Sequence, residues 1–226
     1  MTEAFLNDAV RTRFGKQGGA VAWSDPKTWP PTLAQRWAGA PRAPILSAST
    51  RSFGHANGAG KAVFHLVDWG RSVTACNGWP LTAGAPAAAF ASAHTRDILG
   101  LTPLAWVAAG AASALEPQYF GLAPVDATHI ALRPAGIGWI DVCAIELNKA
   151  FAAQSLTCVE AWKVDLEIVN RHGGAFAISD PRGLSDARIL GTLARSLQQS
   201  RQRWRVAVIC IGVRQGLAVA LENVAD

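Results

Sequence analysis

The chain carries four cysteines, the residue type whose thiolate acts as a nucleophile and whose thiol can exchange a proton. They are widely spaced, at Cys76, Cys143, Cys158 and Cys210, and the absence of a Cys-x-x-Cys pair disfavours a zinc knuckle or ribbon. Cys210 lies in the apolar run VAVICIG, a setting that fits either core packing or a reactive thiol. We expect Cys143 and Cys158 to pack in the core.

Three polar positions are candidates for chemistry, and each also has a plainer explanation. Asn148 directly follows an apolar run, so it fits either the N-cap of a helix or a polar group in a site. Asp180 precedes Pro181, a pair that is common in ordinary turns. His172 stands beside two glycines as a candidate base or metal ligand, although a solvated loop histidine is the simpler explanation.

The chain is basic, with a net charge of +5, which favours anionic partners such as nucleic acid, acidic lipid or a phosphate-bearing cofactor. Arginines from Arg195 to Arg205 surround Trp204, a combination found in nucleic-acid patches. Arginines near the end of a helix also complement its dipole, so a solvated helix end explains the same residues. Nucleic acid therefore remains an alternative partner.

Composition narrows the class of protein. With 226 residues, half of them hydrophobic, the chain can bury a sizeable core, which excludes whole-chain disorder. No uninterrupted apolar run reaches the roughly 18 residues of a membrane span, so we predict no membrane partner. The first residues mix acid and base rather than forming a secretory signal. We therefore predict reduced cysteines and a cytoplasmic location.

Short apolar runs alternate with helical patterns from about residue 72, which indicates an α/β fold. Strands are expected at 4–10, 72–75, 104–108, 139–146, 206–211 and 217–222, the last two forming a hairpin. Helices are expected at 32–37, 87–99, 148–162 and 185–199. The last is the clearest because Ile189, Leu190, Leu193 and Leu197 share one face and Ser185 can cap it.

Several blocks of the sequence, taken in order, resemble the thiolase family. They are TEAFLNDAVRTRFGKQGGA (2–20), FGHANGAG (53–60), SVTACN (72–77), GLTPLAWV (100–107), LEPQYFGLAPVDA (115–127), ELNKAFAAQ (146–154), VNRHGGAFAISDPRGLSDAR (169–188) and CIGVRQGLAVALE (210–222). The resemblance implies a layered α/β fold with a nearly complete C-terminal domain at 72–226 and a remnant of the N-terminal domain at 1–71. Two motifs in the later blocks, Glu-Leu-Asn and Gly-Val-x-Gln-Gly-Leu, resemble the 3-oxoadipyl-CoA branch of the family.

The resemblance also implies roles for individual residues in acyl transfer between coenzyme A thioesters. Cys210 takes the position of the family's second cysteine, which moves a proton at the carbon beside the carbonyl. Asn148 takes the position that holds a water in the oxyanion pocket. Asp180 takes the position of the family's Gly-His-Pro histidine. Gly212 and Gly174 are expected to border the substrate.

The departures from the family pattern imply weakened catalysis. A large internal stretch, which bears the nucleophilic cysteine in the family, is missing between about residues 67 and 72. A carboxylate at Asp180 cannot donate as an imidazolium, and it repels a thiolate. Trp79 places an indole where the family keeps small residues along the pantetheine channel, and Cys76 is a conceivable substitute nucleophile.

Taken together, these patterns predict an acyl-CoA acyltransferase by descent, with impaired or lost activity. It would bind coenzyme A as substrate or product and hold no permanent cofactor or metal. The alternatives are a non-catalytic acyl-CoA-binding or subunit-interaction protein of the same fold, or a nucleic-acid binder through Arg195–Arg205. An apolar surface left by the missing segment predicts a homo-oligomer, pairing with a thiolase subunit, or aggregation.

Overall fold

The computed structural model describes residues 3–11, 15–16, 81–83, 86–175, 180–181, 185–200, 202–211 and 214–224. Several predictions therefore lie outside the described residues. These are the helix at 32–37, the strand at 72–75, Cys76, Trp79 and Gly212.

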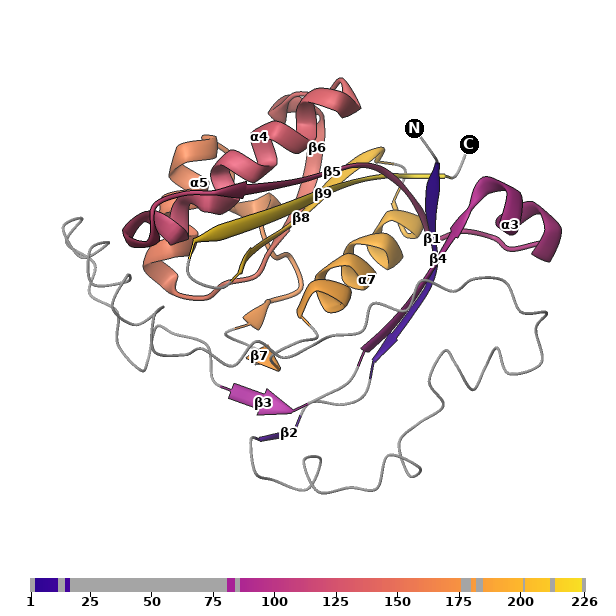
Figure 1. The fold of residues 1–226 in the computed structure, drawn as a ribbon, viewed down its shortest axis with the longest axis horizontal. Helices are drawn as coiled ribbons and strands as arrows, with labels where there is room; N and C mark the ends of the chain where they lie inside the picture. Colours follow the sequence, from indigo (N-terminus) through magenta and orange to yellow (C-terminus); the bar gives the residue numbers. More distant parts are fainter. Residues whose placement is uncertain are drawn as a thin grey trace.

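A six-stranded mixed sheet forms the centre of the molecule (Figure 1). Its order is β4 (Pro86–Ser92), β1 (Ala4–Arg11), β5 (Ala105–Ala114), β9 (Gln215–Glu222), β8 (Trp204–Ile211) and β6 (Val142–Leu147). All neighbours are antiparallel except β6 and β8. A smaller sheet joins β2 (Gly15–Lys16), β3 (Leu81–Ala83) and β7 (Asp180–Pro181). The predicted hairpin of β8 and β9 and the predicted strand at β1 are confirmed.

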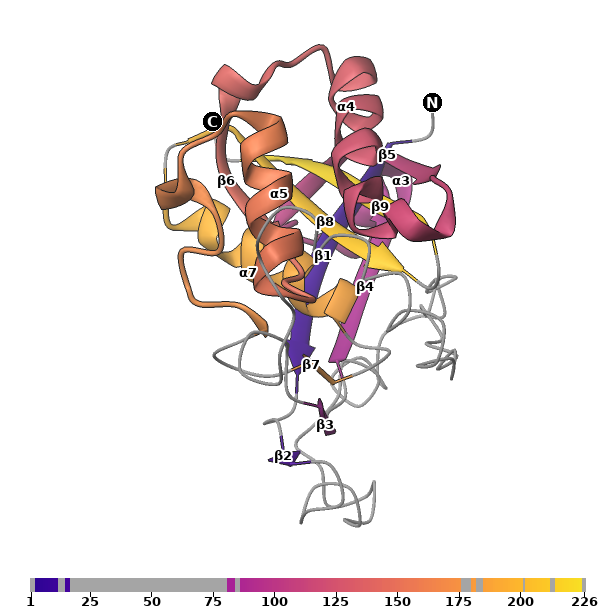
Figure 2. The ribbon, with the colours of Figure 1, turned by 90° about the vertical axis from the view of Figure 1, so that its left-hand side faces the viewer.

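Helices cover both faces of the large sheet (Figures 1 and 2). On one side, α4 (Ala123–Ala135) and α5 (Ala152–Trp162) share an apolar cluster with Val206 and Val208 of β8. On the other side, α7 (Ser185–Gln198) packs on Ala207, the residue between them. Because successive strand residues point to opposite faces, a strand covered on both sides must be apolar throughout. The near-continuous apolar run of β8 follows from this arrangement.

The helix α7 packs against strands from both ends of the chain. Its Ile189, Leu193 and Leu197 are buried, as the helical spacing predicted, and they share a cluster with Leu6 of β1. Gly191 allows a close approach, because a Cβ there would lie 2.8 Å from the Cβ of Ala9. The first strand of the chain is thus part of the same core as the C-terminal strands.

The predicted helix at 87–99 is wrong in its first half. Pro86–Ser92 is the strand β4, and only Ala93–Leu99 is helical, as α3. Antiparallel pairing with β1 overrides the helical preference of the alanines. Ser92 then caps α3, because its hydroxyl accepts the backbone N–H of Thr95 at 3.2 Å.

The boundaries around β6 also differ from the prediction. Trp139–Asp141 is a 3-10 helix, and the strand begins only at Val142. The helix predicted from Asn148 begins at Ala152, so Asn148 is not its N-cap. The Asn148 N–H instead donates to Val208 O at 2.9 Å, which continues the ladder between β6 and β8. The pairing of β6 with β8 sets the boundary between the strand and the helix after it, and no local sequence pattern shows that pairing.

Among the described residues, no helix is both long and apolar enough to cross a membrane.

Candidate functional site

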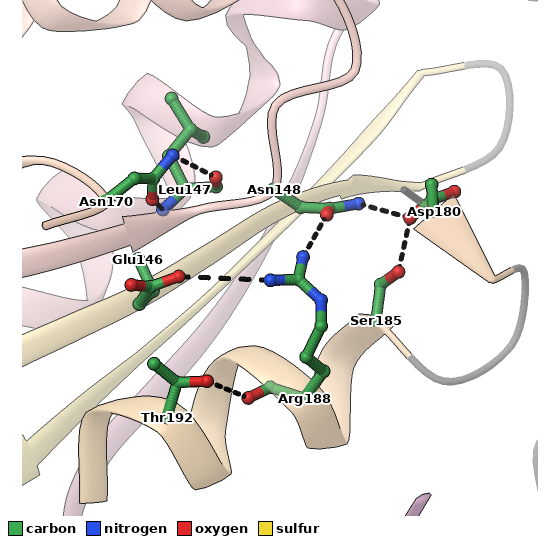
Figure 3. A network of polar contacts seen from close by, with 8 residues as sticks. All are labelled: Glu146, Leu147, Asn148, Asn170, Asp180, Ser185, Arg188 and Thr192. Carbon is green, nitrogen blue, oxygen red and sulfur yellow. Dashed lines mark hydrogen bonds and ion pairs between the residues drawn. The ribbon is translucent and has the colours of Figure 1, made fainter. Parts of the chain in front are cut away.

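The end of β6 is held rigidly, and this fixes the backbone that carries Asn148. The side chain of Asn170 acts as a substitute strand partner for Leu147 (Figure 3). Its Oδ1 accepts the Leu147 N–H at 2.7 Å, and its Nδ2 donates to the Leu147 carbonyl at 2.8 Å. Asn170 has a positive φ of 50°, a conformation that asparagine tolerates better than most residues.

Asn148 and Asp180 meet in the interior, although 32 positions separate them in the chain. The Asn148 Nδ2 donates to Asp180 Oδ1 at 3.3 Å, and the Ser185 hydroxyl donates to the same oxygen. Both Asn148 and Asp180 are buried. Ser185, predicted as a helix cap, is the first residue of α7, and its described hydroxyl contact is with Asp180.

Arg188 reaches from the first turn of α7 into the same network (Figure 3). Its Nη2 donates to Asn148 Oδ1 at 2.6 Å, and its Nη1 lies 4.0 Å from Glu146 Oε2. Burial raises the pKa of Glu146 to about 7, while the positive charges of Arg188 and then Lys149 oppose that shift. The network thus holds a carboxyl group that titrates near neutral pH.

Cys210 belongs to the same region, near the end of β8. Burial is the largest factor that raises the pKa of its thiol to about 12; a backbone hydrogen bond opposes the rise and the negative charge of Asp180 adds to it. The thiol also packs with the buried ring of Phe120. Three residues predicted from the sequence, Asn148, Asp180 and Cys210, are therefore brought into one neighbourhood, with Cys210 protonated at neutral pH.

The other described cysteines have structural contacts. Cys158 is fully buried, as predicted, and its thiol donates to Gly121 O at 3.3 Å. Burial, followed by the charge of Cys210, raises the pKa of Cys158. The prediction that Cys143 packs in the core is wrong, because this residue is only half-buried. Its thiol donates to the carbonyl of Trp204 at 2.7 Å.

Gly174 lies beside the network rather than at an open surface. It is buried with a φ of +98°, and a Cβ there would lie 2.9 Å from Cε of Lys149. Its proposed contact with substrate remains a prediction. His172 is exposed, which fits the solvated-loop interpretation. The residues that the structure describes contain no cluster of His, Cys, Asp and Glu able to hold a metal ion.

No local sequence pattern points to a role for Glu146, Asn170 or Arg188. All three lie inside the blocks that resemble the family, and that position was the only available signal. An arginine and a glutamate separated by 42 positions give no local pattern, so only the packing of α7 on β6 shows that they meet.

The predicted arginine patch is largely engaged within the molecule. Arg195 donates to Asp8 Oδ1 at 2.9 Å and to Ala9 O at 2.7 Å. Arg203 pairs with Glu222, and Arg205 is buried with its guanidinium on Ser196 and Ser200. These contacts give the arginines a role in packing.

Comparison with known proteins agrees with this fold. Residues 101–223 match the family described as thiolase, C-terminal domain. The chain belongs to the thiolase family. The 3-ketoacyl-CoA thiolase of Stutzerimonas stutzeri (strain A1501) is 40% identical over 157 residues, which cover 68% of this chain and 40% of that protein. The beta-ketoadipyl-CoA thiolase of Pseudomonas aeruginosa is 40% identical over 156 residues, with 68% and 39% covered.

The solved structures agree with the sequence relatives. The crystal structure of human mitochondrial 3-ketoacyl-CoA thiolase, also solved in complex with CoA, superimposes with a TM-score of 0.66 at 35% identity. The match covers 68% of this chain and 39% of the human one. The predicted thiolase fold is confirmed, and the chain spans about 40% of the length of the relatives that it matches.

Proposed function

We propose that this chain is an acyl-CoA acyltransferase of the thiolase type whose activity is weak or lost. The observation that carries the proposal is the meeting of Asn148, Asp180 and Cys210 around one buried network. By resemblance, Asn148 and Cys210 take positions of the family motifs and Asp180 takes the position of the histidine. The relatives are named for 3-ketoacyl-CoA and beta-ketoadipyl-CoA. Coenzyme A is the substrate or product, and no permanent cofactor is needed.

In the proposed reaction a thiolate attacks the 3-oxo carbon of the acyl chain, and the bond to the carbon beside the thioester breaks. The electron pair of that bond stays on the departing acetyl-CoA carbon, which takes a proton from the Cys210 thiol. The acyl group on the attacking sulfur then passes to the thiol of a second coenzyme A, whose proton returns to Cys210, so that the attacking thiolate and the Cys210 thiol are both restored. A pKa of about 12 keeps that thiol in its proton-donating form. Asn148 is proposed to stabilise the oxyanion through a water, and Gly212 and Gly174 to border the substrate.

Asp180 is the reason to expect weak turnover. A buried carboxylate beside Cys210 opposes thiolate formation, whereas an imidazolium would favour it. The covalent step also needs a nucleophile that we propose this chain lacks, and Trp79 is proposed to narrow the pantetheine channel. Loss of the nucleophile and of the histidine that activates it lowers turnover by several orders of magnitude.

A binding and cleavage assay tests this proposal. Calorimetry should detect binding of coenzyme A or acetyl-CoA, while cleavage of acetoacetyl-CoA and 3-oxoadipyl-CoA should be slow or absent. Comparison of the two substrates assigns the chain to fatty-acid or beta-ketoadipate metabolism, of which we propose the latter. Fast cleavage that disappears in Cys210→Ala but persists in Cys143→Ala would show that the site is intact. Absence of all binding would remove the proposal.

A second candidate is a non-catalytic protein that binds acyl-CoA or pairs with a full-length thiolase or another copy of itself. Apolar side chains at the surface favour it, since Ile98 is 67% exposed and Ile140 is 96% exposed. Size-exclusion chromatography with and without a full-length relative tests it. We propose a cytoplasmic location, since Cys143, Cys158 and Cys210 are all free thiols.

A further inference from the structure

The backbone around Asn148 is fixed, which leaves the side-chain amide as the variable part of the site. The Asn148 N–H is tied to Val208 O, and Asn170 holds both polar groups of the preceding residue. Rotation of the amide about its last torsion exchanges a donor for an acceptor. The direction of that amide therefore decides what Asn148 can offer to a ligand.

Two neighbours of opposite charge determine that direction. The Arg188 guanidinium can only donate, so the Asn148 oxygen must face it, at 2.6 Å. The NH2 group then faces Asp180, whose oxygen accepts at 3.3 Å. Charge-assisted hydrogen bonds at such short distances are the strong ones, so Arg188 makes the dominant contact.

Arg188 is itself held in place by burial. Only 4% of the residue is exposed, and a guanidinium in the interior must be paired to be tolerated. Glu146 lies across from it at 4.0 Å on β6 (Figure 3). The backbone carbonyl of Arg188 accepts the Thr192 hydroxyl at 2.9 Å within α7. The guanidinium thus links α7 to the end of β6 at the position of the candidate site.

We infer that Arg188 is a positioning residue, whose guanidinium fixes the Asn148 amide with its oxygen toward Arg188 and its NH2 group toward the Asp180 side of the site. The inference rests on the proposed function, in which that NH2 group serves the thioester oxygen or its water. Arg188 acts through Asn148 and need not touch the substrate.

A thermodynamic cycle tests the inference. Arg188→Met should weaken acetyl-CoA binding about tenfold, the effect of one charged hydrogen bond, and Arg188→Lys should restore part of it. In an Asn148→Ala background, Arg188→Met should have no further effect. Arg171→Met, at an exposed arginine, serves as the matched control. Equal losses with and without Asn148, or unchanged binding in folded Arg188→Met, would overturn the inference.

A second measurement needs neither ligand nor variant. In the 15N-labelled protein, a guanidinium held by Asn148 and Glu146 should rotate slowly and give separate Nη resonances for Arg188. Nuclear Overhauser contacts should join these protons to Asn148. A single averaged Nη resonance overturns the inference even if Arg188→Met fails to fold. If the protein binds no acetyl-CoA, the proposed function fails, and this measurement alone decides the orientation of the amide.

Discussion

At the scale of single residues, the site combines a protonated thiol with a buried carboxylate. We propose that Asp180 takes the position of the family's histidine, and its charge adds to the effect of burial on the pKa of Cys210. It also accepts hydrogen bonds from Asn148 and Ser185, so it is built into the network rather than left at its edge. Asp180 therefore contributes both its charge and its hydrogen bonds to this region.

Asp180→His should lower the pKa of Cys210, because a negative charge that raises that pKa is removed. The measurement is the pH dependence of Cys210 alkylation by iodoacetamide, resolved from the other cysteines by peptide mass spectrometry. Asp180→Asn, which removes the charge and keeps a hydrogen-bond acceptor, should give a smaller shift in the same direction. An unchanged alkylation profile in both variants would contradict the assigned role of the carboxylate.

Glu146 should make stability depend on pH. Its pKa is about 7 in the folded chain and about 4.5 without burial, so the folded state binds more protons between these values. The free energy of unfolding should therefore fall as pH rises from about 4.5 to about 7, by roughly 3 kcal/mol, and level off above that range. Urea denaturation across that range measures the fall.

Glu146→Gln should remove this part of the pH dependence. The exposed Glu167→Gln should leave it in place and serves as the control. A slope that is the same in Glu146→Gln and in the unsubstituted chain would show that folding does not raise the pKa of Glu146.

At the scale of elements, two glycines allow close packing that any side chain would prevent. In β9, a Cβ on Gly216 would lie 2.3 Å from the backbone carbonyl of Ala123, where η3 (Pro117–Leu122) leads into α4. In α7, Gly191 faces β1. These contacts set the distances between the helices and the sheet.

Gly216→Ala should destabilise the fold by about 3 kcal/mol or prevent folding, because backbone atoms of Ala123 cannot move aside without shifting α4. Gly110→Ala in the neighbouring strand β5 is the matched control, since its Cβ would meet only Ala218 O at an ordinary 3.8 Å. Urea denaturation measures both. Equal stabilities of the two variants would rule out the close approach of β9 and α4.

Gly191→Ala should cost about 1–3 kcal/mol through contact with Ala9, despite the gain of up to about 1 kcal/mol in helix propensity. Because the clash is between two side chains, Ala9→Gly in the same chain should recover most of the loss. If Gly191→Ala is instead stabilising by itself, β1 does not pack on α7 as described.

At the scale of the whole molecule, residues from both ends of the chain form one core. Leu6 of β1 is fully buried and shares a cluster with Leu221 of β9. Arg195 of α7 adds polar contacts to Asp8 and Ala9 of the same strand. The described parts of the predicted segments 1–71 and 72–226 therefore share a sheet, while the boundary between those domains stays a prediction.

Leu6→Ala should lower the free energy of unfolding by about 2–5 kcal/mol. The same loss should be seen by tryptophan fluorescence, which includes the packed pair Trp139 and Trp162 on the opposite face of the sheet, and by circular dichroism. Ile140→Ala, at a side chain that is 96% exposed, should have little effect. Separate transitions for the two probes would show that β1 is not part of a single cooperative unit.

The sequence by itself determined the elements whose patterns are local. The helical spacing of Ile189, Leu193 and Leu197 predicted α7, and two apolar runs predicted the hairpin of β8 and β9. The order along the chain of blocks that resemble the family predicted Asn148, Asp180 and Cys210 as site residues. The predictions of α7 and of the hairpin succeeded because each depends on neighbours within a turn or a strand. The roles of Asn148, Asp180 and Cys210 stay predictions.

The tertiary structure alone decided the rest. Pairing with β1 turned Pro86–Ser92 from a predicted helix into a strand, and pairing with β8 moved the start of α5 away from Asn148. The Arg188 contact with Glu146 and Asn148 exists only because α7 packs across the end of β6. Register and buried charge pairing depend on residues that are distant along the chain, so no local pattern contains them.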